Sequence, residues 1–274
     1  MKLAYSTYGL QSFDVFDVIP RVAAIGYDAL ELNVADAWPT APEKLDADAR
    51  SRLVEAYREA GFPSPPLMNV IQLCAEDEDV DSKGATLAAT CELARDLNFD
   101  DALPVMTTTL GRRSGSWDDT KETIASQLAH YANIAEDYGA TIAVEPHAGQ
   151  QFDSPEKAVW LVEAMDRQSI RLNFDHSHFH VLGHDLQHCV DLCAPYSVHT
   201  HIKSGLKVDG RVKYQLPGEG SLDLVEYMRA VKRAGIGVPI TVEVTGQIWN
   251  LDDYEPWPVA ERCYRYLHDA REKS

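Results

Sequence analysis

Residues that commonly bind metals are concentrated in the stretch N-F-D-H-S-H-F-H, which runs from Asn173 to His180. One aspartate and three histidines lie within these eight positions, at the end of the apolar run I-R-L-N-F. Three further apolar runs end in similar residues: V-E-P-H contains Glu145 and His147, V-H-T-H-I-K contains His199, His201 and Lys203, and V-E-V-T contains Glu243. Carboxylates and imidazoles are common ligands of divalent cations, so the first hypothesis is metal-dependent chemistry.

Each of these residues has an ordinary structural role when it is taken alone. A single histidine on a strand is usually a hydrogen-bonded core or surface residue, and a glutamate after a strand can simply cap the next helix. The combination differs, because carboxylates buried together repel one another at a considerable cost in free energy. A divalent cation held by Glu145, Asp175, His201 and Glu243 would remove that cost. Three anionic oxygens and one nitrogen suit Mn²⁺ best, with Mg²⁺, Co²⁺ or Zn²⁺ as alternatives.

Short apolar runs alternate with longer amphipathic runs along the chain, as is typical of alternating strands and helices. Strands are predicted at 2–8, 29–34, 65–72, 101–109, 141–147, 170–175, 197–203 and 239–245. Helices are predicted at 14–26, 46–61, 82–97, 117–138, 155–166, 185–194, 221–234 and 255–273, with Ser221 as the cap of the helix at 221–234. Parallel strands need crossover helices, so eight alternations favour an α/β fold, a closed (β/α)8 TIM barrel, as one domain over residues 1–274.

An open, doubly wound sheet is the alternative fold. The chain has no G-x-G-x-x-G after the first predicted strand, which weakens the nucleotide-binding version of that alternative. In a (β/α)8 barrel the active site lies at the C-terminal ends of the strands. The carboxylates and imidazoles that close the last four predicted strands would then meet at one rim.

The overall charge and the cysteines restrict the setting in which the protein works. A net charge of −18 argues against nucleic acids and anionic membranes as partners, because both require a basic surface. The chain has five cysteines, an odd number, and none of them belongs to a C-x-x-C motif. This pattern favours a reduced, cytoplasmic setting. Cys189 and Cys193 are expected to be apolar core residues one helical turn apart. No apolar signal segment or membrane span is expected.

The chain resembles the xylose isomerase-like barrel superfamily in several motifs: V-E-P-H, N-F-D-H-S-H, H-T-H-I-K, P-G-E-G-S-L-D and I-T-V-E-V. This group includes sugar phosphate isomerases and epimerases, ketose 3-epimerases, inosose dehydratases and endonuclease IV. The resemblance implies that Glu145 and Glu243 bind the metal and exchange protons with the substrate. It also implies that Asp175 and His201 bind the metal and that His178 contacts a substrate oxygen.

The chain also departs from the epimerase pattern of this superfamily. Lys207 stands where ketose epimerases often have an arginine for substrate hydroxyls, and with His178 and Lys203 it forms the predicted substrate-binding set. His147 has no counterpart in that pattern and would lie beside the metal as an extra general base or hydroxyl ligand. Endonuclease IV-like enzymes hold three zinc ions with histidines from early strands, whereas no histidine precedes His130 here. An AP endonuclease is therefore disfavoured.

The resemblance implies a metal-dependent sugar isomerase or epimerase, with proton transfer through a metal-stabilised enediolate of a ketose or keto-polyol. The same residues could instead serve a lyase or dehydratase that acts on a keto-sugar, keto-glycoside or inosose by β-elimination. A non-catalytic metal-binding scaffold, or a subunit that needs a partner chain, is the non-enzymatic alternative. Members of the superfamily commonly form oligomers, so a homo-oligomer is also an expectation.

Overall fold

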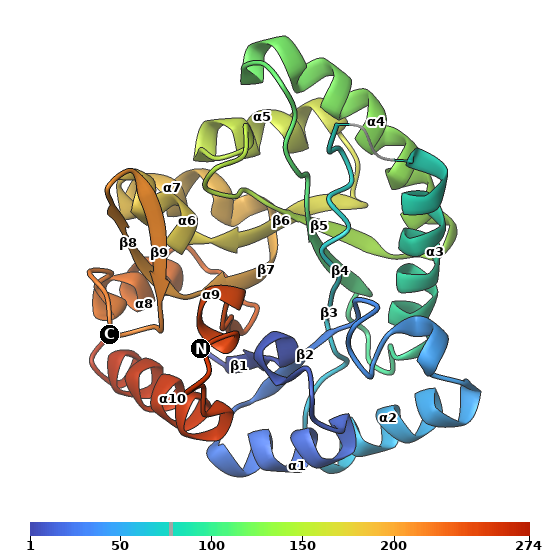
Figure 1. Cartoon of the computed structure of the whole chain (residues 1–274), viewed down its shortest axis with the longest axis vertical. Helices are drawn as coiled ribbons and strands as arrows, with labels where there is room; N and C mark the ends of the chain where they lie inside the picture. The colour runs from blue at the N-terminus through green and yellow to red at the C-terminus, as the bar shows by residue number, and fades with distance from the viewer. Residues whose placement is uncertain (77–78) are drawn as a thin grey trace.

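Eight parallel strands close into a barrel in the computed structural model of the chain, which describes residues 1–76 and 79–274 (Figure 1). The strands are β1 (Leu3–Ser6), β2 (Ala29–Asn33), β3 (Leu67–Met68), β4 (Val105–Thr109), β5 (Thr141–Glu145), β6 (Ile170–Asp175), β7 (Ser197–Ile202) and β10 (Ile240–Val242). Their order around the barrel is β1-β10-β7-β6-β5-β4-β3-β2. The predicted (β/α)8 fold is confirmed.

Helices surround the barrel and cover the outer face of the strands (Figure 1). They are α1 (Val15–Ile25), α2 (Ala47–Glu59), α3 (Val80–Asp96), α4 (Trp117–Asp137), α5 (Pro155–Met165), α7 (Leu186–Cys193), α8 (Leu224–Arg233) and α10 (Pro256–Glu272). Their ends follow local chemistry. The side chain of Asp14 accepts the Phe16 N–H at the start of α1, and Gly26 ends that helix with a left-handed φ of 117°.

The barrel strands are buried on both faces, as expected of parallel strands inside a ring of helices. Every residue of β1, β2 and β5 is buried. Apolar side chains such as Ile142 and Val144 lie in the core, whereas Glu31 and Glu145 are buried polar residues of the same strands. The charged residues therefore lie inside the fold, where each must find a partner.

Several predicted strands are too long, and local chemistry explains where the observed strands begin or end. The predicted strand at 65–72 is reduced to β3, which begins only after Pro65 and Pro66 because these residues have no N–H for a ladder. β4 begins directly after Pro104 for the same reason. β1 stops at Ser6, whose hydroxyl accepts the Tyr8 N–H and starts the short 3-10 helix η1 (Thr7–Leu10).

The predicted cap at Ser221 is wrong. Helix α8 begins at Leu224, and the Asp223 carboxylate accepts the N–H groups of Val225 and Glu226 at 2.9 and 3.1 Å. Ser221 Oγ lies 2.8 Å from His180 Nε2 instead. A carboxylate that accepts two N–H groups satisfies more of the helix terminus than the more distant hydroxyl can.

Two short helices and a hairpin that follow barrel strands at the C-terminal rim were not predicted. Helix α6 (His176–Leu182) follows β6, and the short helix α9 (Gly246–Trp249) follows β10. A hairpin of β8 (Ser204–Val208) and β9 (Arg211–Gln215) follows β7, and Asp209 and Gly210 at its turn have φ values of 48° and 78°. Positive φ at both turn residues identifies the tight turn that suits twisted hairpins.

Within residues 1–76 and 79–274, every helix is too short or too polar to cross a membrane. All five cysteines are buried free thiols. Cys189 and Cys193 both lie on α7 in the hydrophobic core, as expected from their spacing.

Candidate metal centre

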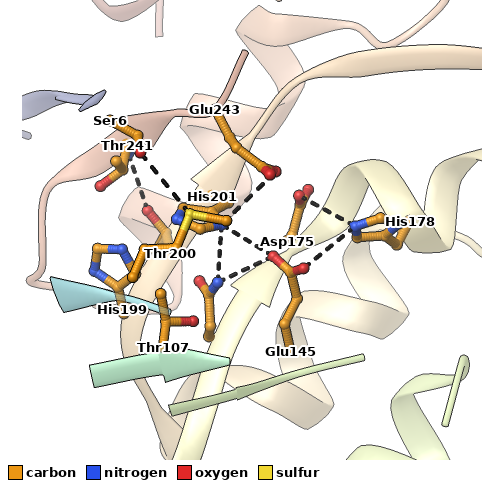
Figure 2. Close-up of polar contacts among 12 residues, drawn as sticks. Ser6, Thr107, Glu145, Asp175, His178, His199, Thr200, His201, Thr241 and Glu243 are labelled. Carbon is orange, nitrogen blue, oxygen red and sulfur yellow. Dashed lines mark hydrogen bonds and ion pairs between the residues drawn. The ribbon is translucent and has the colours of Figure 1, made fainter. Parts of the chain in front are cut away.

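Four side chains from four strand ends converge at the C-terminal rim of the barrel (Figure 2). They are Glu145 at the end of β5, Asp175 at the end of β6, His201 in β7 and Glu243 directly after β10. One potential ligand atom from each lies within 4.8 Å of the others, and all four side chains are buried. The structure thus brings together the four residues predicted as metal ligands.

Local backbone and side-chain contacts orient the carboxylates of this cluster. Asp175 ends β6 and also caps α6, because its Oδ1 accepts the Ser177 N–H at 2.8 Å. Its Oδ2 is left to face the cluster. Asn173 points to the same side of β6, two residues earlier, and its Nδ2 donates to Glu145 Oε1 at 3.0 Å. These contacts hold the carboxylates of Asp175 and Glu145 in place within the cluster.

His201 is held between two carboxylates. Its Nε2 lies 2.8 Å from Glu31 Oε2, and its Nδ1 lies 3.0 Å from Glu145 Oε1. Burial would lower the pKa of His201, but Glu31 and Glu145 raise that pKa well above its usual value. Glu31 therefore keeps a proton on Nε2 and directs Nδ1 toward the four-residue cluster, as outer carboxylates do for metal-binding histidines.

Glu31 serves two histidines at once. Its Oε2 also lies 2.6 Å from Nε2 of His199, and Glu31 is fully buried. Burial would raise the pKa of Glu31, but His201 and His199 lower it far below its usual value. Glu31 is therefore ionised and lies on the Nε2 side of His201. Glu31, His199 and His201 form a second group with metal-binding side chains, but the hydrogen bonds within that group already use the Nε2 atoms of both histidines.

His178 has its proton on Nε2. Its Nδ1 accepts the Ala148 N–H at 3.3 Å and lies 2.7 Å from the Tyr214 hydroxyl, so Nδ1 acts as an acceptor. The Nε2–H then points toward Glu145 Oε2 and Asp175 Oδ2, at 3.5 and 3.7 Å (Figure 2). A protonated nitrogen cannot ligate a cation, so the geometry favours His178 as a hydrogen-bond donor.

His147 lies against His178, with the ring centroids 3.9 Å apart. Its Nδ1 lies 2.9 Å from the Ala148 carbonyl oxygen and must donate to it, which leaves Nε2 unprotonated. Burial, together with His178, lowers the pKa of His147 to about 3. The side chain is therefore neutral near pH 7. It lines the same pocket as Tyr8, Glu145 and Glu243.

The two predicted substrate-binding lysines are placed very differently. The Lys203 ammonium donates to Asp175 Oδ2 and to Glu243 Oε2, so it lies inside the cluster and is 1% exposed. Lys207 is exposed on β8 and lies outside the cluster. The hairpin register pairs Gly205 with Tyr214 and Lys207 with Val212. Lys207 and Tyr214 therefore share one face of the hairpin, the face that contacts His178.

The sequence did not predict the contacts made in the site by three residues, Glu31, Asn173 and Tyr214. Asn173 carried a readable signal, because it lies two positions before Asp175 and so on the same face of a strand. Glu31 interrupts the apolar run A-L-E-L-N, but its partner histidines lie more than 160 positions away. Tyr214 lies on β9 of the hairpin that was not predicted, so its contact with His178 could not be expected.

The donor set fits a divalent cation. Three carboxylates and one imidazole are hard or borderline ligands, and buried carboxylates this close together need a cation between them. Burial would raise the pKa of Glu145, but Lys203 and the hydrogen bonds from His178 and His201 lower it well below its usual value. The carboxylate is therefore ionised and available as a ligand.

The family model described as xylose isomerase-like TIM barrel matches residues 19–259. The inosose isomerase of Bacillus velezensis (strain DSM 23117 / BGSC 10A6 / LMG 26770 / FZB42) is 26% identical over 232 residues, which is 80% of this chain and 79% of that protein. The inosose isomerase of Bacillus subtilis (strain 168) is 26% identical over 136 residues, or 46% of this chain and 48% of that protein.

Solved structures share the fold along the whole chain. The IolI protein with a bound zinc atom superposes with a TM-score of 0.81 at 20% identity and covers 100% of this chain and 99% of that one. D-psicose 3-epimerase from Clostridium cellulolyticum H10, solved with D-tagatose, gives 0.76 at 16% identity, with 99% of both chains covered. Because the family model matches most of its length, the chain belongs to the xylose isomerase-like TIM barrel family.

Proposed function

We propose that the protein is a divalent-metal-dependent isomerase or epimerase that moves a proton next to the carbonyl of a ketose or keto-polyol. The observation that carries this proposal is the convergence of Glu145, Asp175, His201 and Glu243 within 4.8 Å at the C-terminal rim. We propose these four residues as the metal ligands and Mn²⁺ as the native metal. When bound, the cation would act as a Lewis acid that makes the C–H beside a carbonyl more acidic.

We propose that two carboxylates exchange that proton. Glu145 Oε1 and Glu243 Oε2 lie 3.0 and 3.8 Å from His201 Nδ1, and they come from strands that are separated by β6 and β7 in the barrel. We assign one carboxylate as the base that removes the proton and the other as the acid that returns it. Return to the same carbon gives epimerisation, and return to the neighbouring carbon gives isomerisation.

The histidines and lysines would bind the substrate around these carboxylates. His178 offers its Nε2–H to a substrate oxygen. The unprotonated Nε2 of His147 suits both roles predicted for this residue, a general base and a contact with a substrate hydroxyl. Lys207 shares the hairpin face of Tyr214 and remains a candidate for substrate hydroxyls. The Lys203 ammonium donates to Asp175 and Glu243.

Keto-inositols are the first substrates to test, because the two Bacillus relatives are inosose isomerases. Dehydration of such a substrate is the second candidate function. The probable 3-DHS dehydratase AsbF from Bacillus anthracis shares the fold, with a TM-score of 0.79 at 12% identity, which supports dehydration as the alternative to test. The five free thiols are consistent with the proposed cytoplasmic location.

The proposal is tested by solvent exchange. Enzyme loaded with Mn²⁺ is incubated in D₂O with inososes and ketoses, and deuterium at the carbon beside the carbonyl is followed by NMR. Deuterium incorporation with retention of all hydroxyls supports the isomerase or epimerase, and an unsaturated ketone that absorbs ultraviolet light indicates the dehydratase. The variant E243Q should lose both bound metal and exchange. If the protein binds metal but turns over none of these substrates, a non-catalytic metal-binding scaffold is the remaining interpretation.

A further inference from the structure

We infer that Lys203 is an internal cation that fills the metal position when the metal is absent and competes with the metal for its carboxylates. This inference rests on the proposed function, because it concerns the same four ligands. It concerns Lys203, which is not one of those ligands but would change how tightly they bind the metal. The sequence places Lys203 two residues after His201, so both side chains leave the same face of one strand end.

The contacts of Lys203 are with the proposed ligands themselves. Its ammonium donates to Asp175 Oδ2 and to Glu243 Oε2. Asp175 Oδ2 is free for this contact because Oδ1 of the same carboxylate caps α6. Buried lysines are rare unless they are paired, and this one is paired twice. Lys203 thus joins two carboxylates that come from β6 and from the end of β10.

The charges of the cluster explain why a cation belongs there. Glu145, Asp175 and Glu243 bring three carboxylates into one buried space, with Glu31 as a fourth beneath His201. Without a counter-ion these groups would repel one another strongly. The Lys203 ammonium supplies positive charge from within the chain, at hydrogen-bond contact with two of these carboxylates. The metal-free protein can therefore keep its ligands assembled.

The same charge works against the metal. An ammonium bonded to two ligand oxygens both occupies their lone pairs and repels a second cation. Binding of a divalent ion therefore requires Lys203 to release at least one carboxylate and to move away. The face of Tyr214, with its centroid 5.4 Å from Lys203 Nζ, is an electron-rich neighbour that can receive the displaced ammonium.

The test measures metal affinity and metal-free stability, without a substrate. Protein stripped with a chelator is titrated with Mn²⁺ against a fluorescent chelator for wild type, K203M and K203Q. Removal of the competing charge should tighten Mn²⁺ binding by at least about tenfold, the effect of a like charge a few ångströms away. The melting temperature of the stripped protein should fall in both variants, so that added Mn²⁺ raises it by more than in wild type.

The matched control is K83M. Lys83 is also a buried lysine, but it lies on α3 and donates to the Gln72 carbonyl oxygen. K83M should lower stability and leave Mn²⁺ affinity unchanged. Unchanged or weaker Mn²⁺ binding in both K203M and K203Q overturns the inference. If wild type binds no divalent ion, the proposed function is overturned. If K203M then binds the ion, the competing role of Lys203 is still supported, and if K203M also binds none, that role is overturned as well.

Discussion

Nε2 of His201 lies 2.8 Å from Oε2 of Glu31, although 170 positions separate the two residues in the chain. Glu31 lies on β2 and His201 on β7, two strands that are not neighbours in the barrel, so the contact crosses the barrel interior. It determines which nitrogen of His201 faces Glu145, Asp175 and Glu243. The orientation of a proposed metal ligand therefore depends on a residue that does not belong to the ligand set.

Replacement of Glu31 by glutamine should weaken metal binding. The amide keeps the shape of the side chain but removes the negative charge that orients His201 and increases its basicity. Loss of such an outer partner typically lowers metal affinity by about 10- to 100-fold. Competition with a fluorescent chelator measures the dissociation constant for Mn²⁺. E122Q, which changes an exposed glutamate of α4, is the control. Wild-type affinity in E31Q would show that Glu31 does not act through His201.

Replacement of Tyr214 by phenylalanine should slow proton exchange without changing metal affinity. The hydroxyl lies 2.7 Å from His178 Nδ1, and its loss leaves that nitrogen with only the longer contact to the Ala148 N–H. The phenylalanine ring still faces Lys203. Loss of one hydrogen bond to a positioned side chain costs about 1 kcal/mol, so we expect the exchange rate to fall about 5- to 10-fold. If Y214F exchanges the substrate proton at the wild-type rate, the Tyr214 hydroxyl does not contribute to the reaction through His178.

The rim residues could be predicted because each closes an apolar run. Glu145 ends T-I-A-V-E and Asp175 ends I-R-L-N-F-D, and both runs are strands in the structure. In a parallel barrel the ends of all strands lie on one rim, so correct strand identification was enough to bring the four donors together. Their convergence did not require exact strand boundaries, several of which were wrong.

The surroundings of the donors could not be predicted to the same extent. The partnership of Glu31 with His201 depends on strand registers across the barrel, which periodicity does not define. The hairpin was a different case, since K-V-D-G-R-V-K contains the Asp-Gly turn signal between two alternating segments. Recognition of Asp209 and Gly210 as a turn would have separated Lys203 from Lys207, the first in the barrel and the second on the hairpin.

Replacement of Gln247 by alanine should loosen the hairpin. Its side-chain amide accepts the Tyr214 N–H at 3.0 Å and donates to the Val212 carbonyl oxygen at 3.2 Å, so it joins α9 to β9 as a neighbouring strand would. Loss of two partly exposed hydrogen bonds should speed amide exchange in residues 204–215 by about tenfold. Hydrogen exchange followed by mass spectrometry measures this. N250A removes a bond within α9 and serves as the control. Equal protection in Q247A and wild type would contradict the prediction.

Replacement of Asp223 by alanine should destabilise the protein more than replacement of Ser221. Asp223 accepts two N–H groups at the start of α8, and loss of such a cap typically costs about 1 kcal/mol. Ser221 contacts His180 at the surface, and a change of that kind usually alters stability by less than about 0.5 kcal/mol. Urea unfolding of D223A and S221A measures both free energies under the same conditions. A larger loss in S221A would mean that the helix begins at the serine, as the capping pattern in the sequence first indicated, and that the carboxylate two residues later is not its cap.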